Sequence, residues 1–335
     1  MIGVRLRARG SGPVRGMAAA RRALAAILAC ASLLALSACE ARPGAGSGAH
    51  YVIAGGGTTG VYYGYGKQLA AILTDSLEAE FSVAETDGSV DNLQRIGTGA
   101  ALMGFAQSDA AAEAIRGTGA FGEPLPIRAI ARLYDEYVHV VVRADSEIES
   151  LADLEGRTVS LGAKGSGVNL VSTRVMEAAG VPPERVDNPE LGLDASIEAL
   201  RGAEIEAFFW VGGVPTPGLQ QLATGTPIRL LPIESGTVER LNSDYGGVYR
   251  ISEFPLGSYG WETPTVTMTV PNYLVVGRGA SPRLIREVVE TLFDSRSELA
   301  QHVPAAALLD RRQAIFTDPI ELHPGAVDYY VVTKR

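Results

Sequence analysis

The sequence predicts an α/β fold made of two lobes, and three observations lead to that prediction. Short apolar runs alternate with helical patterns, which is typical of βαβ units that build a parallel sheet. A glycine-rich turn at 55–60 follows one apolar run and opens a helix, and a turn of similar design lies at 162–167. The chain has 335 residues, which is long enough for two domains.

Residues 1–38 predict a signal peptide. Six arginines and no acidic residue precede Cys39, and an apolar run extends from Ala23 to Leu36. A basic segment, a short apolar segment and small residues before a cleavage point describe a leader, not a membrane-spanning helix. Leu36-Ser-Ala-Cys39 resembles a bacterial lipobox and predicts lipidation of Cys39; an ordinary signal peptide with a chance cysteine is the alternative. Residues 39–49 then predict a flexible tether.

Charge and cysteine content narrow the class of protein. The net charge is −9, and it becomes −15 once the six arginines of the leader are removed. Such an acidic chain argues against nucleic acid as a partner. Cys30 leaves with the leader and Cys39 carries lipid, so we expect no disulfide. The fold must therefore depend on a hydrophobic core.

The first half of the chain predicts three strand–helix pairs. Ser89 and Ser108 are expected to cap the second and third helices, because serine hydroxyls accept backbone N–H groups at helix starts. A loop rich in glycine and proline then leads to two further strands. The expected elements are strand 51–54, helix 61–74, strand 81–86, helix 89–98, strand 101–106, helix 109–116, strand 127–132 and strand 138–143.

The second half predicts another series of α/β units after a short helical turn at 151–156. Pro282 falls in the first turn of the last helix, which is the favoured place for proline. The expected elements are strand 157–161, helix 168–179, helix 194–201, strands 205–210 and 228–231, strands 266–270 and 273–276, and a long helix from Ser281.

The glycine turns predict a site for an anion. Such turns let backbone N–H groups approach a ligand closely, and the dipole of the following helix favours negative charge. Gly55-Gly-Gly57-Thr-Thr-Gly60 also satisfies the dinucleotide pattern G-x-G-x-x-G, so an exported oxidoreductase is an alternative. Tyr62 and Tyr63 disfavour it, because they place bulky rings where that fold needs close packing. The oxidoreductase interpretation would also leave the second glycine turn, at 162–167, without a role.

The sequence contains no recognisable catalytic constellation. The four histidines are scattered singly, and no G-x-S-x-G elbow occurs. Paired carboxylates such as Asp135-Glu136 are expected to be solvated. Only Glu85 and Asp109 could supply an acid or base near the glycine turns. We therefore expect a binding protein, with no catalytic residue, no cofactor and no metal.

From about residue 50 to residue 332 the chain resembles the TAXI-type substrate-binding proteins of TRAP transporters. Each matching stretch is weak alone, and their order and spacing carry the resemblance. The stretches are the glycine turn with Tyr62-Tyr63, Glu85-Thr-Asp-Gly-Ser-Val-Asp-Asn-Leu93, Phe105-Ala-Gln-Ser-Asp109, Val138-His-Val-Val-Val142, Leu151-Ala-Asp-Leu-Glu-Gly156, Gly165-Ser-Gly167, Phe208-Phe-Trp-Val-Gly-Gly-Val-Pro215, Pro264-Thr-Val266 and Leu322-His-Pro-Gly-Ala326.

The resemblance implies a two-lobed, class II periplasmic-binding-protein fold with a ligand cleft between the lobes. Lobe one would comprise residues 50–136 and 233–335, and lobe two residues 137–232. The protein would lie outside the cytoplasm, bind a small carboxylate similar to glutamate or 2-oxoglutarate, and deliver it to membrane permease subunits driven by an ion gradient. A sensor that reports to a membrane signalling partner is the alternative.

Closure requires contacts from both lobes to one ligand, which suggests a set of site residues. Hydroxyls and backbone amides can bind a carboxylate without a cation, and aromatic rings can form the walls. The expected ligand-binding residues are Thr58, Thr59, Tyr62 and Gln107 from lobe one, Tyr134 between the lobes, and Ser166, Gly167, Val168, Trp210 and Gly212 from lobe two.

Overall fold

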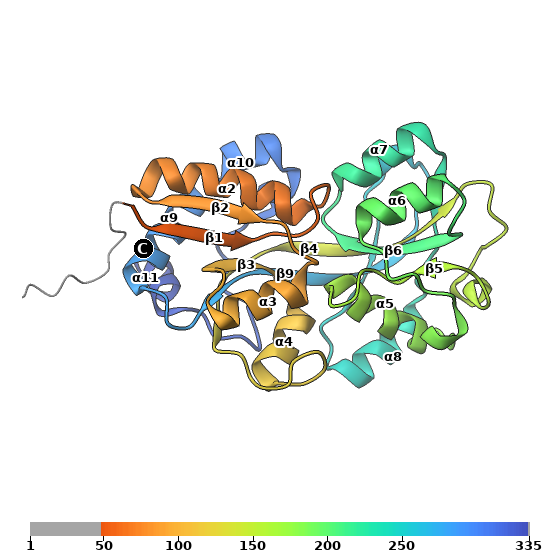
Figure 1. Cartoon of the computed structure of the whole chain (residues 1–335), viewed down its shortest axis with the longest axis horizontal. Coiled ribbons are helices and arrows are strands. Elements are labelled where there is room, and N and C mark those ends of the chain that lie inside the picture. Colours follow the sequence, from red (N-terminus) through yellow and green to blue (C-terminus); the bar gives the residue numbers. More distant parts are fainter. Residues whose placement is uncertain (1–47, 334–335) are drawn as a thin grey trace, which may run out of the picture. The chain divides into compact units, whose positions relative to one another are not determined.

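The computed structural model describes residues 48–333. The predicted signal peptide, Cys39 and all of the predicted tether up to residue 47 lie outside these residues. Within the described part, nine strands form one sheet in the order β2-β1-β3-β9-β4-β6-β5, with β7 paired to β4 and β8 paired to β9. Helices cover both faces of this sheet (Figure 1). The predicted α/β class is confirmed.

The first lobe contains three βα units, as the alternating pattern predicts, and the C-terminal helices. Strands β1, β2 and β3 pair in parallel. The elements are β1 (His50–Ala54), α2 (Val61–Leu77), β2 (Glu80–Ala84), α3 (Ser89–Thr98), β3 (Met103–Gln107), α4 (Ser108–Arg116), α9 (Pro282–Asp294), α10 (Arg296–His302), η4 (Pro304–Leu308) and α11 (Pro324–Val332).

The second lobe repeats the α/β design around the parallel pair β5 and β6. Its sequence predicts the other elements but not η2, α7, α8, β8 or η3. The elements are η1 (Leu151–Leu154), β5 (Val159–Ser160), α5 (Gly167–Ala178), η2 (Pro183–Arg185), α6 (Leu193–Arg201), β6 (Ala207–Gly212), α7 (Pro217–Gly225), β7 (Ile228–Leu230), α8 (Ser235–Tyr245), β8 (Arg250–Glu253) and η3 (Ser258–Gly260).

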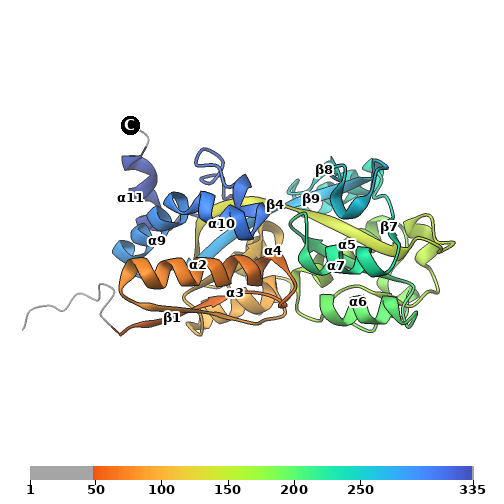
Figure 2. The same ribbon diagram turned by 90° about the horizontal axis from the view of Figure 1, so that it is seen from above.

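Two long antiparallel strands, β4 (Ile127–Arg143) and β9 (Val266–Gly277), run through both lobes (Figure 2). The prediction of separate strands at 127–132 and 138–143, and at 266–270 and 273–276, is wrong. Polar residues and Pro271 interrupt the apolar pattern at the breaks. The backbone nevertheless continues, because β4 and β9 pair with each other along their length, with shifts in register between Ala129 and Tyr134.

The hydrophobic core divides between the lobes at the middle of these two strands. Core residues of the first lobe end at Tyr134 and resume at Tyr273, whereas those of the second extend from Tyr137 to Val270. The second lobe therefore includes α8, which packs on its core, and β8, which pairs with the Val266–Thr269 part of β9. It differs in this from the predicted range 137–232. The chain returns to the first lobe inside β9.

Two predicted helix caps are wrong in detail. The N-cap of α3 is Gly88 and the N-cap of α4 is Gln107, so Ser89 and Ser108 are the first helical residues instead. Among residues 48–333, no helix combines the length and apolar character needed to cross a membrane.

Candidate functional site

A small cavity lies where the two lobes meet, with a volume of about 40 Å³. It has room for a few waters at most, so the lobes are closed on each other. Glycines and apolar or neutral polar residues line it, and none of the lining residues carries a charge. They are Gly56, Gly57, Gly60, Val61, Tyr62, Gly88, Ser89, Gln107, Gly167, Val168, Trp210, Val211 and Gly212.

Four helices begin at this cavity. The N-cap residues of α2, α3 and α4 line it, and they are Gly60, Gly88 and Gln107; Gly167, the first residue of α5, also lines it. The first amides of a helix have no carbonyl of a preceding turn to bond, and the helix dipole adds partial positive charge at this end. Convergence of four such ends favours an anionic group without any cationic side chain.

The second lobe approaches the first closely at Gly167. A Cβ atom at this position would overlap Gln107 Oε1 and approach Ser89 Oγ to 2.7 Å. A larger residue at the start of α5 would have to displace these side chains of the first lobe. The glycine is therefore required by close approach across the cleft in the closed state.

Trp210 forms the opposite wall of the cavity. Its indole Nε1 donates to Thr216 Oγ1 over 3.0 Å, which fixes the ring. A Cβ on Gly60 would lie 3.3 Å from that ring, and a Cβ on Gly212 would lie 2.7 Å from Nε1. The ring thus packs against glycines of both lobes. Together with the hydrogen bond from Gly218 N to Thr59 O (3.2 Å), this packing covers the first glycine turn.

A buried polar cluster lies behind the cavity. Glu136 is 0% exposed, so the expectation that Asp135-Glu136 forms a solvated pair is wrong for Glu136. Gln107 Nε2 donates to Glu136 Oε2 over 3.0 Å, and Asn272 Nδ2 donates to Oε1 over 3.2 Å. Burial raises the pKa of Glu136 to about 8, although hydrogen bonds from Tyr62 and Gln107 act in the opposite direction.

Six of the ten predicted site residues line the cavity. They are Tyr62, Gln107, Gly167, Val168, Trp210 and Gly212. The Tyr62 hydroxyl lies 3.3 Å from Ser89 Oγ, and its ring stacks on Phe105. Burial raises the pKa of Tyr62 well above its ordinary value, so its hydroxyl stays protonated and can donate.

The other four predicted residues lie outside the cavity lining. The hydroxyls of Thr58 and Thr59 both donate to the carboxylate of Asp194 in the first turn of α6, so they join the lobes at the surface. Tyr134 is buried in the first-lobe core, where its ring stacks on Tyr65. Ser166 caps α5 by accepting the Asn169 amide over 2.9 Å.

Ser89 and Glu136 are two polar residues of this region that the sequence did not predict as part of a site. Ser89 lines the cavity and accepts the Gln107 backbone amide over 3.2 Å. Its position after Gly88 at a helix start predicts only a cap. Glu136 was missed because nothing in the neighbouring residues distinguishes a buried carboxylate from a solvated one.

An ion-pair cluster joins the lobes on another side. Arg174 of α5 bonds Asp109 Oδ2 over 3.2 Å and also bonds Glu113, both on α4. Tyr249 donates to the same Asp109 oxygen over 2.7 Å. The side chains of Arg174 and Asp109 are only 6% and 2% exposed. Asp109, predicted as one of two possible acid–base groups, therefore takes part in a buried contact between the lobes.

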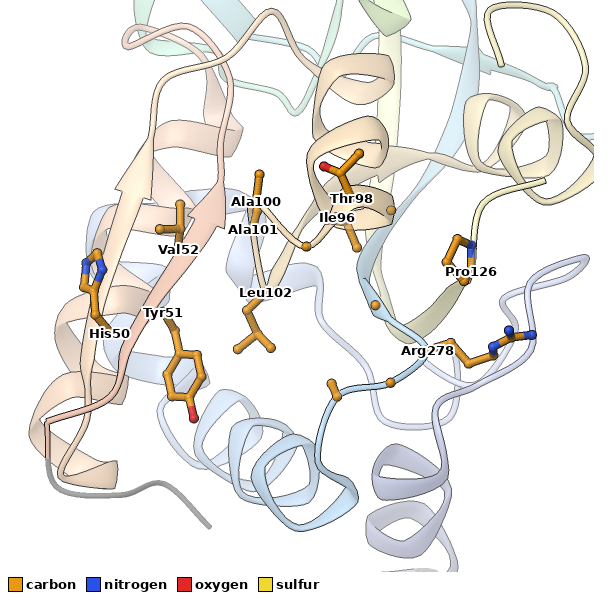
Figure 3. Close-up of a pocket in the computed structure, with 15 residues that line it drawn as sticks. His50, Tyr51, Val52, Ile96, Thr98, Ala100, Ala101, Leu102, Pro126 and Arg278 are labelled. Atoms are coloured by element: carbon orange, nitrogen blue, oxygen red, sulfur yellow. The ribbon is translucent and has the colours of Figure 1, made fainter. Parts of the chain in front are cut away.

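A larger hollow of about 630 Å³ lies elsewhere, at the amino ends of β1 and β3. Figure 3 shows His50 and Tyr51 on one side of it and Pro126 and Arg278 on the other. Parallel α/β sheets bind ligands at the carboxyl ends of their strands, where the glycine turn lies. The last turn of α3 also faces this hollow, and a helix C-terminus disfavours anions. We therefore assign the candidate site to the smaller cavity between the lobes.

Comparison with known proteins agrees with this architecture. The structure is similar to that of the periplasmic binding protein BugD, with a TM-score of 0.55 and 12% identity over 86% of this chain and 93% of that one. It is similar to a periplasmic transporter, with a TM-score of 0.54 and 12% identity over 88% and 94% of the two chains. It is also similar to PhnD1 from Prochlorococcus marinus, solved with methylphosphonate. The TM-score is 0.51, with 12% identity over 78% of this chain and 90% of that one.

The fold is therefore that of the two-lobed periplasmic binding proteins. The sequence profile described as the NMT1-like family matches residues 53–331, and the chain belongs to that family.

Proposed function

We propose that this protein is an extracytoplasmic solute-binding receptor, not an enzyme, and that it captures a small carboxylate by closure of its lobes. The observation that carries the proposal is the meeting of four helix starts from both lobes around one uncharged cavity. A carboxylate placed there contacts both lobes at once, and only such shared contacts can stabilise the closed form.

The strands that connect the lobes support the same mechanism. Within residues 48–333, the lobes are joined through β4 and β9 at about Glu136 and Pro271. Bending at these positions would open the cleft and give the ligand access to the cavity. Hinges of this kind are made by a few residues that absorb changes in backbone angles.

The sequence features add the transport context. We infer export through the signal peptide at 1–38, attachment to the membrane through lipid on Cys39, and delivery of the cargo to a TRAP-type permease driven by an ion gradient. Glutamate-like and 2-oxoglutarate-like compounds are the proposed cargo class. A family resemblance to the TAXI-type receptors supports this reading, and no cofactor or metal is required by it.

Thermal unfolding tests the proposal. Purified protein should unfold at a higher temperature in the presence of one or more small carboxylates. At a hundredfold excess over Kd, binding to the folded state adds about 2.7 kcal/mol to the free energy of unfolding. Nicotinamide dinucleotides serve as the control and should leave the transition unchanged. A dinucleotide that raises the unfolding temperature would contradict the proposed function. So would the failure of every carboxylate to raise it.

A further inference from the structure

Glu136 is a buried carboxyl group at the point where β4 passes from one lobe to the other. The arginines of this region are held by other carboxylates: Arg132 by Asp135 and Arg174 by Asp109 and Glu113. No ion pair of the described residues includes Glu136, and its partners are amide and hydroxyl donors instead. This carboxyl group therefore lies beside the cleft without a counterion.

When Glu136 is ionised, the two amides bound to it leave their own oxygens without donors. Gln107 and Asn272 both turn their N–H groups toward the carboxyl group. As a result Gln107 Oε1 and Asn272 Oδ1 are buried, and neither has a hydrogen-bond partner among residues 48–333. Leaving a buried acceptor unsatisfied is unfavourable, so a group that supplies a donor at either oxygen is bound preferentially.

Of these two oxygens, that of Gln107 faces the cleft. Gln107 lines the cavity, and the atom that approaches the Gly167 position across the cleft is Oε1. The cavity thus presents two kinds of surface to a ligand. Helix starts offer backbone N–H groups, and Gln107 offers an acceptor with a carboxyl group behind it.

We propose that Glu136 positions the amide of Gln107 so that its oxygen accepts a hydrogen bond from the cargo, which makes the cargo a carboxylate that also bears an ammonium group. This inference rests on the proposed receptor function and identifies the substrate class of the same site. The helix starts bind the carboxylate, and Gln107 binds the ammonium. A 2-oxo acid brings only acceptors to Gln107 and is rejected, because two acceptors face each other.

The ionisation of Glu136 is coupled to the preference for an amino acid over a 2-oxo acid. Its raised pKa of about 8 reflects burial. The titratable groups that act on it are Tyr62 from α2, Asp109 from α4, and Tyr134 and Asp135 from β4, whereas β3 and β9 contribute the neutral Gln107 and Asn272. An ammonium group at Gln107 favours the ionised carboxylate. Binding of an amino acid at neutral pH therefore releases a proton, and affinity rises with pH toward the pKa of Glu136.

Calorimetric titration of the whole purified protein tests the inference. The probes are two matched pairs: L-glutamate with 2-oxoglutarate, and L-leucine with 4-methyl-2-oxopentanoate. We expect the amino acid of a bound pair to bind about tenfold or more tightly than its 2-oxo counterpart, because a hydrogen bond to a charged group is lost. Gln107→Met and Glu136→Gln should narrow this ratio. Asp135→Asn, which changes the adjacent exposed carboxylate, should leave it unchanged.

Proton release in the unaltered protein gives a readout that a merely structural role would not produce. Titrations in buffers of different ionisation enthalpy should detect release with the amino acid and none with the 2-oxo acid. Equal or tighter binding of the 2-oxo acid, or the absence of proton release, overturns the inference and leaves the receptor function standing. Failure of every probe to bind overturns both.

Discussion

Adjacent residues of a strand can differ completely in burial, and Asp135 and Glu136 are an example. Successive side chains of a strand point to opposite faces of the sheet. Asp135 reaches the surface and pairs with Arg132 over 2.6 Å, whereas Glu136 is fully buried behind Gln107. Two acidic letters in a row look alike in the sequence. Their difference comes from the elements that cover each face of β4.

The buried carboxyl group makes stability depend on pH. The pKa of Glu136 is raised from an ordinary value of 4.5 to about 8, so between these values the folded state binds a proton that the unfolded state has lost. The contribution of Glu136 to the free energy of unfolding is therefore fully present below pH 4.5. It falls as pH rises from 4.5 to about 8, by up to about 1.4 kcal/mol per pH unit. We expect Glu136→Gln to remove this slope.

Urea unfolding across that pH range measures the effect, with Asp135→Asn as the matched control. The control should keep most of the slope of the unaltered protein, because Asp135 is a minor cause of the raised pKa of Glu136. Parallel curves for Glu136→Gln and the unaltered protein would show that folding does not raise the pKa of Glu136.

At the scale of elements, the start of α5 decides how far the lobes can close. Gly167 faces Gln107 and Ser89 across the cleft, where a Cβ atom would overlap Gln107 Oε1 and come within 2.7 Å of Ser89 Oγ. The helix itself does not need this glycine, because alanine is the better helix former by about 1 kcal/mol. Closure between lobes, and not local structure, requires it.

Gly167→Ala should therefore weaken ligand binding while it leaves the fold intact. We expect a loss of affinity of about tenfold or more for any ligand that the unaltered protein binds, with little change in the unfolding temperature without ligand. Gly225→Ala, at the end of α7, is a suitable control, because a Cβ there meets nothing within 4 Å. Equal affinities for the two variants would contradict the role assigned to Gly167.

At the scale of the described molecule, contacts on two sides of the cleft hold the lobes together. Thr58 and Thr59 bond Asp194 at one side, and Arg174 bonds Asp109 and Glu113 at the other. The arginine cluster is buried, so loss of one partner leaves charges that can regain water only if the lobes separate. Breaking a buried pair in this way costs about 3–5 kcal/mol in a rigid site.

Arg174→Met should therefore shift the ligand-free protein toward an open form. We expect a larger radius of gyration in X-ray scattering than for the unaltered protein, and a weaker affinity for ligand. Arg157→Met provides the control, because the Arg157–Glu206 pair lies within the second lobe and is about 40% exposed on both sides. A radius that does not change in Arg174→Met would show that this cluster does not hold the closed form.

Much of this protein follows from the sequence itself. The alternation of apolar runs and helical patterns indicated the α/β class, and the first three strand–helix units lie within a few residues of the predicted ranges. Glycine turns, Trp210 and Gln107 could be related to a cleft because local patterns place them at strand ends. These features are determined by residues that are close together in the chain, so they can be predicted from the sequence.

The tertiary structure alone decided which groups meet across the cleft. The pairing of β4 with β9 made continuous strands from segments that read as broken, and it moved the return to the first lobe from residue 233 to the middle of β9. Closure drew Thr58 and Thr59 to Asp194 and buried Asp109 against Arg174. It also placed Glu136 beside the cavity. Burial and partnership between distant segments depend on packing, and no local pattern of residues records them.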